Sequence, residues 1–295
     1  STGTVFVGSK DGSIFELTLS SSVEITGSIR RNIMPKPLES FVVNAFGMYC
    51  ALNDNRIAFI NIGAGQTLPS FSNPVSGNGS IARITNSVGN NVYASTTNGK
   101  LVSLNGTNTI ALNNVDFPPI KGFDFYDEKN GIFITADRFI RRTSDGGAVW
   151  QTVLPDMAST ATWNGVTLIN SQEALIYGNN GYLGHQTALG VPVTVNTSLS
   201  ASINEIKMKN NLEGLVVCGT GLRKVNRSNS GSIFQLSSIN TLGLGSNVNV
   251  TDLHLFNNGS AVVLGGTNAY YITAPNGNSA TAYQLNLGTV SGTLN

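Results

Sequence analysis

The feature that most constrains this sequence is a strand–turn–strand unit that recurs about every 43 positions along its 295 residues. In each copy a short apolar segment leads into a turn with Asp, Asn, Thr or Gly, and a second apolar segment follows. The first copy is Val5-Phe6-Val7, Asp11-Gly12 and Ile14-Phe15, and the fourth is Ile132-Phe133-Ile134, Asp137-Arg138 and Phe139-Ile140. The seven turns fall near positions 11, 54, 98, 137, 180, 220 and 267. A repeat of this regularity indicates an array of similar structural units.

The length of the repeat and its pattern of apolar residues indicate β-structure. About 43 residues accommodate four strands of about five residues with short turns between them. Alternation such as Ser13-Ile14-Phe15-Glu16-Leu17 has a period of two residues, and no long apolar stripe with helical spacing is present. We therefore expect an all-β fold, a seven-bladed β-propeller of four-stranded antiparallel blades.

The two ends of the sequence predict how such a ring closes. The first copy starts at its second strand, 4–8, while the sequence continues past the last copy through 288–294. We expect this C-terminal strand to complete the first blade, because pairing removes exposed sheet edges. No Pro-, Gly- or Ser-rich linker interrupts the repeats, so a single domain, 1–295, is expected. The expected blades are 1–32 with 287–295, 33–75, 76–115, 116–157, 158–198, 199–241 and 242–286.

Composition narrows the partners and the location. With 17 Lys and Arg against 16 Asp and Glu, the net charge is +1 and excludes the basic surplus of a nucleic-acid-binding protein. No apolar segment reaches the roughly 18 residues that a membrane span needs. Charged residues make up 11% of the chain, against about 25% in ordinary soluble domains. A surface of Asn, Ser, Thr and Gly is typical of secreted and virion proteins, so we expect an extracellular or virion-surface location, with the periplasm as the alternative.

One segment of the fourth unit resembles a known motif. It reads Thr143-Ser144-Asp145-Gly146-Gly147-Ala148-Val149-Trp150. Asp can accept hydrogen bonds from turn amides, Gly permits a positive φ, and Trp can pack between strands. The segment resembles the Asp-box, or BNR repeat, of photosystem II assembly-factor-like and sialidase-like propellers, and a degraded copy runs from Asn229 to Phe234. The resemblance implies a structural role for Thr143, Asp145, Gly147 and Trp150.

The same resemblance raises a catalytic alternative, a sialidase-like glycoside hydrolase. That family places three Arg residues on one substrate carboxylate, the first of them in a Phe/Tyr-Arg-Ile-Pro motif, and no Arg here precedes Ile-Pro. Arg30-Arg31 and Arg141-Arg142 are adjacent pairs whose members point to opposite faces of a strand. Asp124, Asp127 and Glu128 are carboxylates of the type that glycoside hydrolysis requires, but their segment reads as a solvated loop. We therefore expect no enzymatic activity.

Cysteine and histidine usage gives no sign of a cofactor. Cys50 and Cys218 each lie in an apolar strand-like segment and lack metal-ligand spacing, so buried free thiols are expected. His185 and His254 fall in different repeats, and neither has other metal-ligand residues next to it in the sequence. No metal site and no cofactor are expected.

With catalysis and cofactor binding not expected, we expect the protein to bind a partner through loops on a rigid scaffold. We expect a protein partner or a surface glycan, in a secreted or periplasmic protein or in a phage tail or capsid-decoration protein that belongs to a larger assembly. The face that we favour carries the turns between the second and third strands of each unit. Its charged residues are Lys10, Asp11, Asp54, Arg56, Lys100, Asp137 and Arg138. Mixed charges of this kind favour orientation and partner choice over raw affinity.

Overall fold

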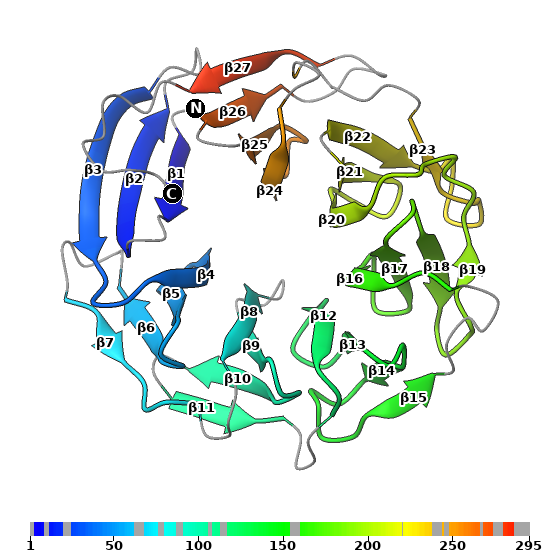
Figure 1. The fold of residues 1–295 in the computed structure, drawn as a ribbon, viewed down its shortest axis with the longest axis horizontal. Coiled ribbons are helices and arrows are strands. Elements are labelled where there is room, and N and C mark those ends of the chain that lie inside the picture. The colour runs from blue at the N-terminus through cyan, green and yellow to red at the C-terminus, as the bar shows by residue number, and fades with distance from the viewer. Residues whose placement is uncertain are drawn as a thin grey trace. The chain divides into compact units, whose positions relative to one another are not determined.

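A computed structural model describes residues 3–8, 12–19, 25–61, 68–75, 80–86, 91–105, 108–112, 117–153, 160–219, 221–237, 244, 248–265, 268–273 and 280–285. All its regular elements in these ranges are β-strands, grouped into seven antiparallel sheets that we number in chain order (Figure 1). Its described part contains no helix that could cross a membrane. The described residues divide into two compact units, 3–152 and 153–285.

The first unit holds sheets 1 to 4. Sheet 1 consists of β1 (Gly3–Gly8), β2 (Ser13–Leu19) and β3 (Ile25–Ile33). Sheet 2 consists of β4 (Leu38–Asn44), β5 (Gly47–Leu52), β6 (Ile57–Ile60) and β7 (Ser70–Phe71). Sheet 3 consists of β8 (Ile81–Asn86), β9 (Val92–Thr96), β10 (Leu101–Asn105) and β11 (Asn108–Ala111). Sheet 4 consists of β12 (Ile120–Phe125), β13 (Gly131–Thr135), β14 (Ile140–Thr143) and β15 (Gln151–Val153), whose last residue opens the second unit.

The second unit holds sheets 5 to 7. Sheet 5 consists of β16 (Trp163–Leu168), β17 (Glu173–Gly178), β18 (Leu183–Thr187) and β19 (Val193–Thr194). Sheet 6 consists of β20 (Ile203–Met208), β21 (Glu213–Cys218), β22 (Gly221–Asn226) and β23 (Gln235–Leu236). Sheet 7 consists of β24 (Val250–Leu255), β25 (Ala261–Gly265), β26 (Asn268–Ile272) and β27 (Ala282–Leu285).

The described residues form six complete four-stranded blades, not the seven that the repeat predicts. In each blade the strands pair in chain order, whereas sheet 1 contains only β1, β2 and β3. The C-terminal strand that we expected to pair with β1 falls in 286–295, outside the described residues. The all-β fold and the four-stranded antiparallel blade are therefore confirmed, and the closure of the first blade is not described.

The hydrophobic core lies between successive sheets. Apolar clusters join sheets 2 and 3, sheets 3 and 4, sheets 5 and 6, and sheets 6 and 7. The second strand of a blade is covered on both faces, and every residue of β5, β9 and β13 is buried. Strands buried on both faces are continuously apolar rather than alternating, which explains runs such as Ile132-Phe133-Ile134. Cys50 and Cys218 are buried free thiols, as predicted, and burial raises the pKa of Cys50 to about 12.

Two backbone devices recur in the blades. The first strand of all six blades changes register by one residue near its start, between Leu38 and Ser40 in sheet 2 and at the corresponding positions in the others. The residue after the second strand donates its N–H to the carbonyl just before the first strand, at 2.8–3.1 Å. These five donors are Asn53, Thr97, Ala136, Asn179 and Gly219. Each bond fixes the turn that follows the second strand to its own blade.

Candidate functional site

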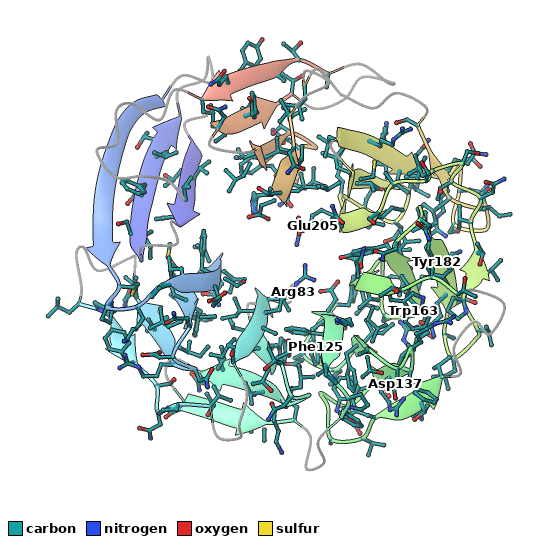
Figure 2. The ribbon with its side chains drawn as sticks, in the orientation of Figure 1. Arg83, Phe125, Asp137, Trp163, Tyr182 and Glu205 are labelled. Carbon is teal, nitrogen blue, oxygen red and sulfur yellow. The ribbon has the colours of Figure 1, made fainter. Side chains whose placement is uncertain are left out.

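The predicted binding residues that the structure describes lie at the same end of sheets 2, 3 and 4. Asp54 and Arg56 lie in the β5–β6 turn, Lys100 in the β9–β10 turn, and Asp137 and Arg138 in the β13–β14 turn. Asp137 is labelled in Figure 2. Lys10 and Asp11 lie outside the described residues. The topology thus places the five described residues in equivalent turns of three successive blades.

These turns share one backbone geometry, and Arg138 is the exceptional residue in it. Asn55, Gly99 and Arg138 occupy left-handed backbone conformations, with φ of 68°, 86° and 69°. Asn and Gly adopt this conformation readily, whereas a long side chain in it is strained. Each turn is closed by a hydrogen bond from this residue to the end of the second strand, such as Arg138 N–H to Thr135 O at 2.9 Å.

The acidic residues of these turns are engaged locally. Arg56 donates from Nη2 and Nε to Asp54 Oδ2, at 2.6 and 2.9 Å, and this side-chain hydrogen bonding lowers the pKa of Asp54. Thr135 donates its hydroxyl to Asp137 Oδ1 at 2.5 Å. Asp54 and Arg56 neutralise each other's charge. The β13–β14 turn differs from the other turns in having an arginine, Arg138, in the left-handed conformation.

The loop that resembles an Asp-box is a compact hydrogen-bonded turn between β14 and β15. The Thr143 hydroxyl donates to Asp145 Oδ1 at 2.7 Å and accepts the Gly147 amide at 2.9 Å. The amide of Val149 donates to Asp145 Oδ1 at 3.0 Å, and this hydrogen bond lowers the pKa of Asp145. Gly146 and Gly147 have φ of 76° and 96°. These three hydrogen bonds and two positive φ angles account for the residue types at 143, 145, 146 and 147.

The Trp150 ring at the end of this loop packs onto sheets 3 and 4. Its Nε1 donates to the Leu112 carbonyl at 3.1 Å, and its ring meets Phe133 edge-on at 4.6 Å between centroids. Phe125, on β12 (Figure 2), lies 6.1 Å from Trp150 and stacks on Tyr93 of β9 at 3.7 Å. The aromatic cluster fastens the loop to the core between two blades.

A second cluster, in the second unit, was not anticipated from the sequence. Arg227 donates from Nη1 and Nη2 to the two carboxylate oxygens of Glu173, both at 2.8 Å, and its guanidinium lies 4.5 Å from the Phe234 ring centroid. His185 Nε2 lies 3.1 Å from Glu173 Oε1, and Asn170 donates to Oε2 at 2.7 Å. The hydrogen bonds from Arg227 are the main reason that the pKa of Glu173 falls to about 2.

This cluster fastens sheet 5 to sheet 6. Glu173 and His185 belong to β17 and β18. Arg227 directly follows β22 of sheet 6, and Phe234 ends the Asn229–Phe234 segment that leads into β23. In that segment Asn229 Oδ1 accepts the Gly231 amide at 3.0 Å, and Phe234 is fully buried. Burial lowers the pKa of His185, so the imidazole is mainly neutral at pH 7. Residues 54 positions apart come together here, which no local sequence pattern indicates.

Two of the three carboxylates of the hydrolase alternative accept local backbone hydrogen bonds, and the third lines a pocket. Asp127 Oδ1 accepts the amides of Lys129 and Asn130 at 2.8 and 2.7 Å, and Asp124 Oδ1 accepts the Phe125 amide at 2.9 Å. Glu128 follows Asp127 in the β12–β13 turn and lines a pocket of about 360 Å³ in the first unit. This pocket lies at the end of sheets 2 to 4 opposite the charged turns. Its lining is Phe46, Tyr49, Asn91, Tyr93, Ser103, Leu104, Asn105, Leu112, Glu128 and Gly146.

Comparison with known proteins identifies the fold. No protein-family model matches the chain, and no curated protein matches it in sequence. The WD40 propeller domain of Doa1 is similar in structure, with a TM-score of 0.71 over 91% of this chain and 88% of that one at 13% identity. YCF48 bound to D1 peptide gives 0.67 over 89% and 85% at 12%, and streptogramin B lyase gives 0.62 over 88% and 89% at 14%. The fold is that of a β-propeller.

Proposed function

We propose that this protein is a non-enzymatic scaffold that binds a protein partner at the β5–β6, β9–β10 and β13–β14 turns. The observation that carries the proposal is the left-handed backbone of Arg138, at a position where sheets 2 and 3 have Asn55 and Gly99. A left-handed conformation costs a non-Gly residue about 1–2 kcal/mol. Strain of this kind concentrates at functional sites. We infer that position 138 is an arginine because its side chain is needed for function, and not because the turn favours arginine.

The turns supply a rigid platform for that side chain. Thr97 and Ala136 anchor the two later turns through backbone hydrogen bonds to Ser80 and Pro119, at 2.8 and 2.9 Å. A surface that is ordered before binding loses little conformational entropy when a partner docks. Arg138 would pair with a carboxylate of the partner, since a guanidinium binds carboxylates in a bidentate geometry. The preferred partner is therefore an acidic protein segment.

Non-enzymatic action is supported by the structural engagement of the acidic side chains. Asp54 pairs with Arg56, Glu173 with Arg227, and Glu213 with Lys209 and Lys224. The fold itself leaves activity open, since one neighbour is by its name a lyase. A sialidase-like hydrolase is the alternative, and turnover of fluorogenic sialosides or other glycosides above background would establish it.

We further propose that the chain is a diverged Asp-box propeller that acts outside the cytoplasm or on a virion. The contacts of Thr143 and Asp145 support the Asp-box assignment, and the low charged content supports the location. A secreted or periplasmic binding protein and a phage tail or capsid-decoration protein are two settings for the same scaffold. The seventh blade would be sheet 1, completed by the C-terminal strand.

Arg138→Gly tests the binding proposal. Relief of the strained backbone should raise the melting temperature, while loss of the guanidinium should abolish most binding to acidic peptides on a peptide array. Asn55→Gly is the matched control, because it changes the equivalent turn without removing a charge, and it should leave binding unchanged. Binding by Arg138→Gly at the wild-type level would contradict the proposal, and so would the absence of any acidic peptide bound by the wild-type protein.

A further inference from the structure

We propose that the pocket at the opposite end of sheets 2 to 4 is a second binding site, and that its ligand is a neutral saccharide. Phe46 comes from the β4–β5 turn, Asn91 from the residue before β9, Asn105 from the end of β10, and Glu128 from the β12–β13 turn. Three blades thus contribute to one concave surface. Its volume of about 360 Å³ lies within the range of small-molecule sites, roughly 300–1,000 Å³.

The aromatic side of the pocket offers a stacking platform. Phe46 is 66% exposed, an unusual position for a phenylalanine. Its turn is rigid, because Asn44 Oδ1 accepts the amides of Phe46 and Gly47 at 2.9 and 3.1 Å. A Cβ at Gly47 would collide with the carbonyl oxygen of Ile60, so glycine is required there. The turn therefore holds the Phe46 ring in water, where the C–H face of a pyranose can cover it.

The polar side of the pocket suits hydroxyl groups. Asn91, Ser103 and Asn105 contribute two amides and a hydroxyl, each of which can both donate and accept hydrogen bonds. A sugar hydroxyl has the same dual character, so neighbouring hydroxyls can be matched by a donor and an acceptor from one amide. Aromatic rings beside such groups fit a ligand that is apolar on one face and hydroxylated at its edge.

The charge of the pocket selects a neutral ligand. Glu128 is the only charged residue among the described residues of the lining, so an anionic sugar such as a sialoside would meet a carboxylate and no cation. A lysine side chain is the competing ligand, because Glu128 and Phe46 could receive an ammonium group. We favour the saccharide because three of the four polar side chains are uncharged.

Saturation-transfer NMR with individual neutral disaccharides (cellobiose, lactose, maltose and chitobiose) tests the site. The wild-type protein should bind at least one of them, and Phe46→Ala should weaken that binding about tenfold, as expected for loss of a central aromatic contact. Asn105→Ala should weaken it as well. Tyr283→Ala is the matched control, because Tyr283 is an exposed aromatic residue, 45% accessible, on β27 of the second unit. It should leave binding unchanged.

Two further variants separate the alternatives. Glu128→Gln should keep saccharide binding, whereas it should abolish binding of a trilysine peptide if a cation were the true ligand. Arg138→Gly should leave saccharide binding intact, so that this proposal and the protein-partner proposal fail independently. Failure of the wild-type protein to bind any of the four disaccharides would overturn the inference. Undiminished binding by a folded Phe46→Ala variant would overturn it too.

Discussion

At the scale of single residues, aromatic and ionic side chains join neighbouring blades. Trp150 reaches from the β14–β15 loop to the carbonyl of Leu112, which follows β11 of sheet 3. Arg227, which follows β22 of sheet 6, reaches Glu173 of sheet 5. Both contacts give a partner to polar groups that would cost free energy if they were buried without one. Each side chain therefore stabilises an interface between two blades as well as its own turn.

We predict that Trp150→Ala lowers the free energy of unfolding by about 3 kcal/mol, because it removes a large ring packed against Phe133 and Phe125. Trp150→Phe keeps most of the ring contact and loses only the bond to Leu112, so it should cost about 1 kcal/mol. Chemical denaturation measures both values. Equal costs for the two variants would show that ring packing is not the source of the stability.

At the scale of elements, four of the described hairpins between first and second strands share one side-chain hydrogen-bonding pattern. Asn44, Asp127, Asn170 and Asn210 each accept two backbone amides, two and three residues later, through one side-chain oxygen. This Asx geometry lets a side chain take the place of a backbone acceptor in a tight turn. It recurs in sheets 2, 4, 5 and 6.

We predict that Asn210→Ala destabilises the protein by about 1 kcal/mol, because the Leu212 and Glu213 amides lose their acceptor. Its neighbour provides the control: Asn211→Ala, in the same exposed turn, should change the stability by less than about 0.5 kcal/mol. Thermal unfolding of the two variants, compared side by side, distinguishes them. A similar loss of stability in both variants would mean that alanine itself is unfavourable in this turn and that the Asx hydrogen bonds are not the cause.

The elements also show which parts of the structure the sequence could predict. The turns near Asp54, Asn98 and Asp137 were predictable because turn-forming Asp or Asn residues interrupt apolar runs there. The left-handed backbone of Arg138 was not predictable, because no residue type at that position indicates it. The pocket was not predictable either, because its lining extends from Phe46 to Gly146 and only the packing of three blades brings these residues together. The Glu173–Arg227 pair was missed for the same reason. The register change in each first strand has no residue type in common, since it involves Glu39, Lys121 and Asn164 alike.

At the scale of the whole molecule, the main question is which segment completes sheet 1, where three strands are described. Among the described residues β1 pairs with β2 alone, while the second strand of each complete blade has two neighbours. We predict that deletion of residues 287–295 lowers the melting temperature markedly, because the proposed closing strand would then be lost. Calorimetry of the truncated protein provides the measurement.

A point substitution makes the same test without shortening the chain. Val290→Pro removes a backbone donor and should reproduce much of the loss, whereas Val290→Thr keeps a β-branched residue and should not. If the truncated protein melts at the temperature of the full chain, the C-terminal segment does not close the first blade.

The hydrogen bond that ties each turn to its own blade has an evolutionary consequence. Donor and acceptor are both backbone groups, and the residues that carry them include Asn, Thr, Ala and Gly as donors and Pro, Ser and Thr as acceptors. Natural selection on this bond therefore constrains the path of the chain and hardly constrains the side chains. Sequences with little in common can therefore build the same architecture. The solved structures of similar fold are only 11–14% identical to this chain, with TM-scores of 0.62–0.71.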